Sequence, residues 1–137
     1  MDNINNQEQQ QNMVQSVQNL EAIINEGLRV ALLEKSPDRS LEVLLGHLGR
    51  ALNGERTYIF ERNESGCDDN TYEWVADGIQ PEKENLQNVP PEVCANWYRN
   101  FNVGKHIVIK NLEDIRQSDP LQYDNLNKQD IHSLVVV

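Results

Sequence analysis

The chain has 137 residues, the length of one ordinary domain with at most a single helix added to it. It carries 12 basic and 22 acidic residues, and this net charge of −10 opposes binding to the phosphates of DNA, RNA or an anionic membrane. The opening residues do not match a secretory signal, and no apolar run reaches membrane-spanning length. We therefore expect a cytoplasmic protein without nucleic-acid or membrane partners.

The cysteines and histidines do not form the patterns typical of metal or haem sites. Cys67 and Cys94 lie far apart with no nearby ligand spacing, which indicates free thiols rather than a disulfide or a zinc site. His47, His106 and His132 are interpreted as helix-surface, strand-edge and turn residues. The sequence thus predicts neither a metal nor another cofactor.

The first third of the chain predicts two successive helices. Residues 1–11 are rich in Asn and Gln and lack apolar anchors, so a disordered start is expected there. A narrow heptad-like seam follows over about residues 12–35, with one irregular step near Gly27, and it predicts a dimerisation helix; packing within the same chain is the alternative. The seam residues are Met13, Val17, Leu20, Ile24 and Leu28.

A second helix is expected to begin at Ser36-Pro37-Asp38, which combines a capping side chain, a proline at the first helical position and an early acid. Leucines at helical spacing carry it to about Leu52, and Asn53-Gly54 ends it. Gly46 and Gly49 weaken this helix but permit a close approach, for example by a neighbouring helix; alternatively they are neutral.

Strand and helix patterns alternate in the rest of the chain. Residues 56–62 and 72–76 predict two strands joined by a surface loop over 63–70, whose acids lack the order of ligands in a calcium loop. We then expect a helix that begins at Pro90-Pro91-Glu92 and is closed by Gly104, and three further elements. These are a strand over 106–109, a helix over about 121–128 and a strand over 133–137.

These residues, taken in order, resemble the GAF domains of bacterial signalling proteins such as diguanylate cyclases and histidine kinases. The matching stretches are Arg-Thr-Tyr-Ile-Phe-Glu-Arg at 56–62, Tyr-Glu-Trp-Val-Ala-Asp-Gly-Ile at 72–79, Asn-Leu-Gln-Asn-Val-Pro at 85–90, Trp97, His-Ile-Val-Ile-Lys-Asn-Leu at 106–112 and residues 129–137. The resemblance implies an α+β fold of GAF or PAS type: a five- or six-stranded antiparallel sheet with flanking helices, preceded by a long N-terminal helix. It divides the chain into residues 1–36, the disordered start and signalling helix, and residues 37–137, a sensor domain that lacks the family's last helix and strand.

The function implied by this resemblance is regulatory. A homodimeric sensor module would bind a small ligand, dimerise, or do both, to control a downstream output domain that this chain does not contain. The residues that could line a pocket for this ligand are Trp74, Trp97, Tyr98, Arg116 and Tyr123, although packing in the core or at its rim is the alternative for each. The alternative interpretation is a purely structural dimerisation module that binds no ligand.

We expect no enzymatic activity, because the sequence lacks nucleophile, metal and phosphate-loop motifs. The signatures of the cyclic-nucleotide-binding and bilin-binding GAF families are also absent. A GAF branch that reduces free methionine sulfoxide with cysteines is a remaining alternative. Cys94 falls in an early helical turn, which could lower the pKa of its thiol, but the surroundings of the two cysteines do not reproduce that branch's pattern.

Overall fold

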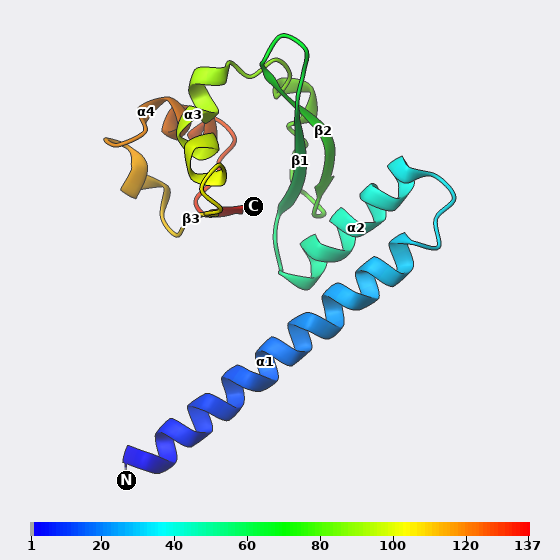
Figure 1. Cartoon of the computed structure of the whole chain (residues 1–137), viewed down its shortest axis with the longest axis vertical. Coiled ribbons are helices and arrows are strands. Elements are labelled where there is room, and N and C mark those ends of the chain that lie inside the picture. The colour runs from blue at the N-terminus through cyan, green and yellow to red at the C-terminus, as the bar shows by residue number, and fades with distance from the viewer. Residues whose placement is uncertain (1) are drawn as a thin grey trace. The chain divides into compact units, whose positions relative to one another are not determined.

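The computed structural model describes residues 2–137, with side chains from Asn6 onward, and Met1 of the expected disordered start lies outside the described part. Two α-helices are followed by two strands, and shorter helices then alternate with two more strands (Figure 1). The predicted α+β class is confirmed. The elements are α1 (Asp2–Ala31), α2 (Pro37–Ala51), β1 (Arg56–Arg62), β2 (Asp68–Val75), η1 (Lys83–Asn85), α3 (Pro91–Phe101), β3 (Ile107–Ile109), η2 (Leu112–Ile115), α4 (Pro120–Asn127) and β4 (Leu134–Val136).

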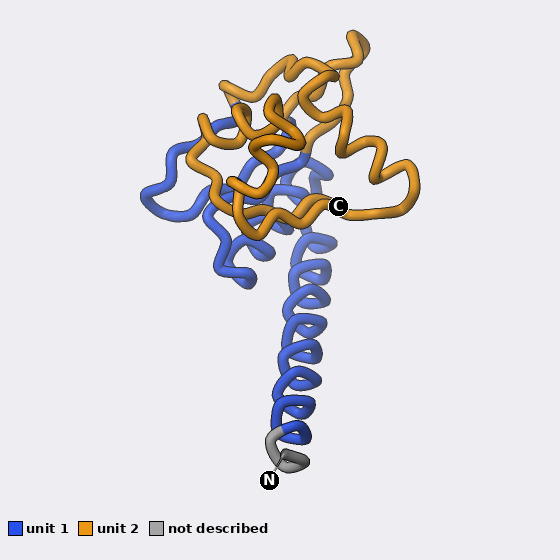
Figure 2. The backbone as a smooth tube through the Cα atoms, turned by 90° about the vertical axis from the view of Figure 1, so that its left-hand side faces the viewer, with its two compact units in different colours: residues 1–59, 71–83 blue, residues 60–70, 84–137 orange. Residues whose placement is uncertain are grey.

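The chain forms two compact units (Figure 2). Unit 1 comprises residues 1–59 and 71–83, and unit 2 comprises residues 60–70 and 84–137. Unit 1 therefore contains α1 together with α2, whereas the boundary expected from the sequence lay between these two helices.

Helix α1 begins at Asp2, so the described part of residues 1–11, which were expected to be disordered, is helical. The physical reason is that Gln and Glu are good helix formers, and neither Gly nor Pro occurs before Gly27. The start of α2 follows the sequence prediction closely. The Ser36 hydroxyl accepts a hydrogen bond from the Arg39 backbone N–H, and Pro37 occupies the first helical position.

Helix α2 packs against the C-terminal part of α1. Nε2 of His47 lies 2.7 Å from the carbonyl oxygen of Ile23, and because a carbonyl only accepts, this ring nitrogen carries the proton. The imidazole lies directly over Gly27, where an added Cβ would stand 2.5 Å from His47 Cδ2. Closer to the connecting turn, the Ser40 hydroxyl donates to the carbonyl of the buried Ala31 at 2.8 Å. His47 is therefore a contact between helices rather than the helix-surface residue we expected.

The two glycines in the C-terminal half of α2 accommodate an indole ring. Gly46 and Gly49 are buried, and the ring of Trp74 from β2 lies against both. The guanidinium of Arg50 lies 5.7 Å from the same ring. The close approach that these glycines predicted is thus confirmed, but it is made by a side chain of the hairpin and not by a neighbouring helix.

The hairpin formed by β1 and β2 has a shorter loop than predicted. Strand β2 already begins at Asp68, so that Asp68 and Asn70 are buried strand residues, with Asp68 only 1% exposed, and not part of a surface loop. The reason lies in pairing with the segment before α3. Asp68 exchanges two backbone hydrogen bonds with Val89, at 3.0 and 2.9 Å, and the N–H of Asn70 donates to the carbonyl of Leu86.

Unit 2 has a small core beside a second two-stranded sheet. Strands β3 and β4 pair antiparallel, with Ile107 opposite Val136 and Ile109 opposite Leu134. The core consists of Ile109, Leu112, Tyr123 and Leu126, with Trp97, Ile107, Ile115, Ile131 and Leu134 packed against it. Within residues 2–137 each sheet has two strands, so the expectation of one five- or six-stranded sheet is wrong. Strands β1 and β2 pair as a hairpin, whereas η2 and α4 lie between β3 and β4 in the chain, and each of these strands pairs only with the other.

Candidate functional site

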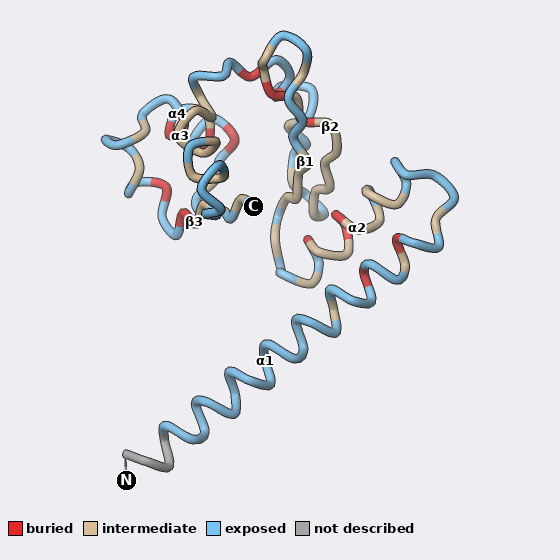
Figure 3. Tube along the Cα trace, viewed as in Figure 1, coloured by how far each residue is buried: buried red, intermediate tan, exposed pale blue. Residues whose placement is uncertain are grey.

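The predicted seam lies on the outside of α1. Its five residues are between 37% and 63% exposed, although all are large and apolar, and most of the helix is coloured as exposed in Figure 3. They are Met13, Val17, Leu20, Ile24 and Leu28. The residues of α1 that α2 covers are others, chiefly Ile23, Gly27 and Ala31. Packing within the chain, the alternative, is thus observed for those residues of unit 1.

An open groove of about 460 Å³ runs beside the contact between α1 and α2. Its lining is mostly apolar and carries three polar side chains; the residues are Ala22, Ile23, Glu26, His47, Arg50 and Ala51. Each polar side chain also has a contact within unit 1. Glu26 forms a surface ion pair with Arg29 at 2.8 Å, and the hydrogen bond from Arg29 lowers the pKa of the Glu26 carboxyl. The groove could bind a small molecule or a short segment of chain through apolar contacts.

The five pocket residues proposed from the sequence do not form one group. Trp74 lies in unit 1 on the glycines of α2, whereas the other four belong to unit 2. Trp97 packs on the core that contains Tyr123. Arg116 lies 5.2 Å from the Tyr123 ring, and both side chains bind the carboxylate of Glu113. These residues thus make packing and hydrogen-bond contacts.

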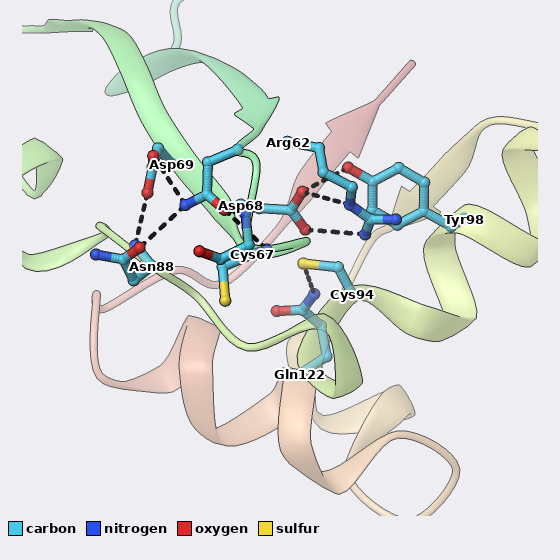
Figure 4. Close-up of polar contacts among 10 residues, drawn as sticks. Arg62, Cys67, Asp68, Asp69, Asn88, Cys94, Tyr98 and Gln122 are labelled. Carbon is cyan, nitrogen blue, oxygen red and sulfur yellow. Dashed lines mark hydrogen bonds and ion pairs between the residues drawn. The ribbon is translucent and has the colours of Figure 1, made fainter.

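A buried carboxylate joins the hairpin to α3 (Figure 4). Asp68 accepts hydrogen bonds from Arg62 Nε at 3.3 Å and from the Tyr98 hydroxyl at 2.7 Å, and the Arg62 guanidinium lies 3.8 Å from the centre of the Tyr98 ring. Burial, followed by the bond to Asp68, raises the pKa of Tyr98 to about 12. Sequence reasoning missed Arg62 and Asp68. The polar residues Asp68 and Asn70, two positions apart, were the available signal, since such residues share one face of a strand.

Cys94 lies next to this group at the start of α3. Its sulfur is 3.6 Å from Nε2 of the fully buried Gln122 in α4 (Figure 4). Burial raises the pKa of the Cys94 thiol to about 11. The suggestion that the early helical turn could lower this pKa is wrong, because desolvation, which disfavours the thiolate, has the largest influence on it. At neutral pH Cys94 is therefore a protonated packing residue and a poor nucleophile.

Further properties follow from the described residues as a whole. From Asp2 to the last residue, no helix combines the length and the apolar character that crossing a membrane requires. The same part of the chain contains no group of three or more His, Cys, Asp or Glu side chains placed to hold a metal ion.

Comparison with known proteins identifies no relative: no family model matches the chain, and no curated protein is significantly similar to it. The resemblance to GAF domains therefore rests on the order and spacing of the sequence motifs alone.

Proposed function

We propose that this chain is the regulatory module of a cytoplasmic signalling protein, that it works as a homodimer, and that α1 is its dimerisation helix. The proposal includes a GAF-like sensor role and control of a downstream output domain. One observation carries it: the apolar seam of α1 remains exposed although α2 packs on the same helix.

Burial of the seam against a partner would stabilise α1. A helix gains most of its stability in water from packing of its apolar face, and α2 reaches only the C-terminal part of α1. The five apolar side chains between Met13 and Leu28 would gain about 1.5–3 kcal/mol each if they moved from full exposure to full burial. They are already partly covered, so the gain for each is smaller, and pairing with a second copy of the chain would provide it.

Unit 1 also contains a path by which the hairpin can act on α1. Trp74 of β2 is held by the two glycines of α2, and the Tyr72 hydroxyl bonds to Asp38 in the first turn of α2. His47 then connects α2 to the backbone of α1. These contacts support the proposal that a change in the hairpin reaches the helix that forms the dimer.

The test is the mass of the purified protein by light scattering. The double variant Leu20→Glu with Ile24→Glu places two charges on the seam and should convert a dimer into a monomer. The matched control, Gln18→Glu with Asn25→Glu, adds the same charge to exposed positions of the same helix outside the seam and should leave the dimer intact. A wild-type protein that is monomeric at all accessible concentrations, or a seam variant that remains dimeric, would overturn the proposal.

Ligand sensing is the second candidate, and the groove between α1 and α2 favours it. Its volume lies within the range of small-molecule sites, and Glu26, His47 and Arg50 offer polar groups around an apolar floor. Native mass spectrometry of protein purified from cells should reveal a retained small molecule. Ala51→Trp should abolish the retention by filling the groove. A dimer that never retains a molecule would instead be the purely structural dimerisation module.

A further inference from the structure

The type of apolar residue along α1 identifies the partner that this helix fits. In the heptad register of the seam, Val17 and Ile24 occupy the a positions, whereas Met13 and Leu20 occupy the d positions. β-Branched residues at a together with Leu at d favour two parallel strands in a coiled coil. The exposed side chains of α1 therefore match a second copy of the same helix that runs in the same direction.

The distribution of charge supports the same partner. About a quarter of the chain is charged and its net charge is −10, so most of its surface repels another copy. The stretch Gln9–Asn25 is different, because Glu21 is its sole charged residue among 17, where an average stretch would hold about four. Two copies can therefore approach along this part of α1 without the repulsion that opposes contact elsewhere.

Helix α2 determines how the seam ends. The regular heptad continues from Ile24 to Gly27 and then to Ala31, but both residues are buried beneath α2. The next exposed large apolar side chain of α1 after Ile24 is Leu28, four residues on. Two successive steps of four, from Leu20 to Ile24 and from Ile24 to Leu28, constitute a stutter, which locally unwinds a coiled coil.

We infer that two copies of this chain pair in parallel and in register along residues 13–28, and that α2, by covering Gly27 and Ala31, directs the end of the coiled coil onto Leu28. This inference rests on the proposed function and gives the partner, direction and register of its dimer helix. It also gives α2 a regulatory role. If α2 leaves Gly27, the regular heptad through Gly27 and Ala31 becomes available, and the coiled coil changes its twist.

The experiment is disulfide cross-linking of single-cysteine variants under mild oxidation, with the full chain in a Cys67→Ser background. Cys94 remains as a half-buried thiol whose raised pKa keeps it protonated, and the parent without an added cysteine gives the baseline. The variants are Val17→Cys, Ile24→Cys, Leu28→Cys and Ala31→Cys, with Gln18→Cys as a matched control at an exposed position outside the seam. A disulfide requires Cα atoms within about 7 Å of each other.

We expect Val17→Cys and Ile24→Cys each to form linked dimers at least about tenfold more efficiently than Gln18→Cys. The reason is that the proposed pairing brings residues 17 and 24 of one copy within disulfide reach of the same residues in the other copy, whereas residue 18 lies outside the seam. These positions are seven residues, or about 10 Å, apart along the helix, so an antiparallel pair cannot link both to themselves. We also expect Leu28→Cys to link and Ala31→Cys not to link. In a Gly27→Leu background α2 cannot pack as observed, and there Ala31→Cys should link in preference to Leu28→Cys.

Failure of this inference is distinguishable from failure of the proposed function. A dimer by light scattering in which Val17→Cys and Ile24→Cys do not both link would refute the parallel pairing and leave the dimer standing. Linking at Ala31 in place of Leu28 in the Cys67→Ser background would refute the role of α2. A monomer that links at no position would refute the inference and the proposed function together.

Discussion

Substitution of Gly49 by Ala is the most direct test of how the hairpin is attached to α2. In an ordinary helix interior this change stabilises, by about 0.5–1 kcal/mol, because Ala has the higher helix propensity. Here the added Cβ would overlap Cζ3 and Cε3 of Trp74 and would lie 3.1 Å from its Cη2. Carbon atoms in good contact are about 3.5–4.0 Å apart, so the indole ring has to move.

The expected magnitude follows from these two opposing effects. Overpacking a fitted site costs typically about 1–3 kcal/mol, and the ring that must shift also contacts Gly46 and lies near Arg50. With the propensity gain of about 0.5–1 kcal/mol subtracted, Gly49→Ala should lower the free energy of unfolding by up to about 2.5 kcal/mol. In a Trp74→Leu background, where the larger ring is absent, the same substitution should raise the free energy of unfolding by about 0.5–1 kcal/mol.

The assay is urea unfolding followed by circular dichroism for the four proteins of this double-mutant cycle. The change of sign between the two backgrounds is the decisive quantity, because general damage to α2 would lower the stability in both. If Gly49→Ala stabilised the wild-type background as well, Trp74 would not lie on Gly49, and the proposed path from the hairpin to α1 would lose its first contact.

Two further predictions concern unit 2. Asp68→Ala should destabilise unit 2 by about 1–3 kcal/mol, because Tyr98 and Arg62 lose their shared acceptor. An unchanged free energy of unfolding in urea would contradict this role of Asp68. The Cys94 thiol, whose pKa burial raises from 9.0 to about 11, keeps its proton longer in the folded state than in the unfolded state. The contribution of the thiol to stability is therefore fully present below pH 9 and is lost as the pH rises through about 11. Over this window the free energy of unfolding should fall more for wild type than for Cys94→Ser. Parallel pH profiles of the two proteins would show that folding does not raise the pKa of this thiol.

Local signals account for the elements that were predicted well. The start of α2 depends on Ser36 and Pro37, and that of α4 on Asp119 and Pro120, which are neighbours in the chain. The turn that follows α3 is also local, since Gly104 adopts a positive φ of 72°, which glycine reaches without strain. The seam of α1 also follows from residue spacing alone, although the family resemblance and the regulatory function remain predictions.

The sequence by itself determined the α+β class, the starts of α2 and α4, and the apolar seam of α1, because each depends on residues within a few positions of one another. The tertiary structure alone decided which strands pair, that Asp68 is buried with Arg62 and Tyr98, and that Trp74 lies on the glycines of α2. It also decided that the Cys94 pKa rises, since desolvation depends on what surrounds the sulfur. These outcomes join residues far apart in the chain, and periodicity does not specify such contacts.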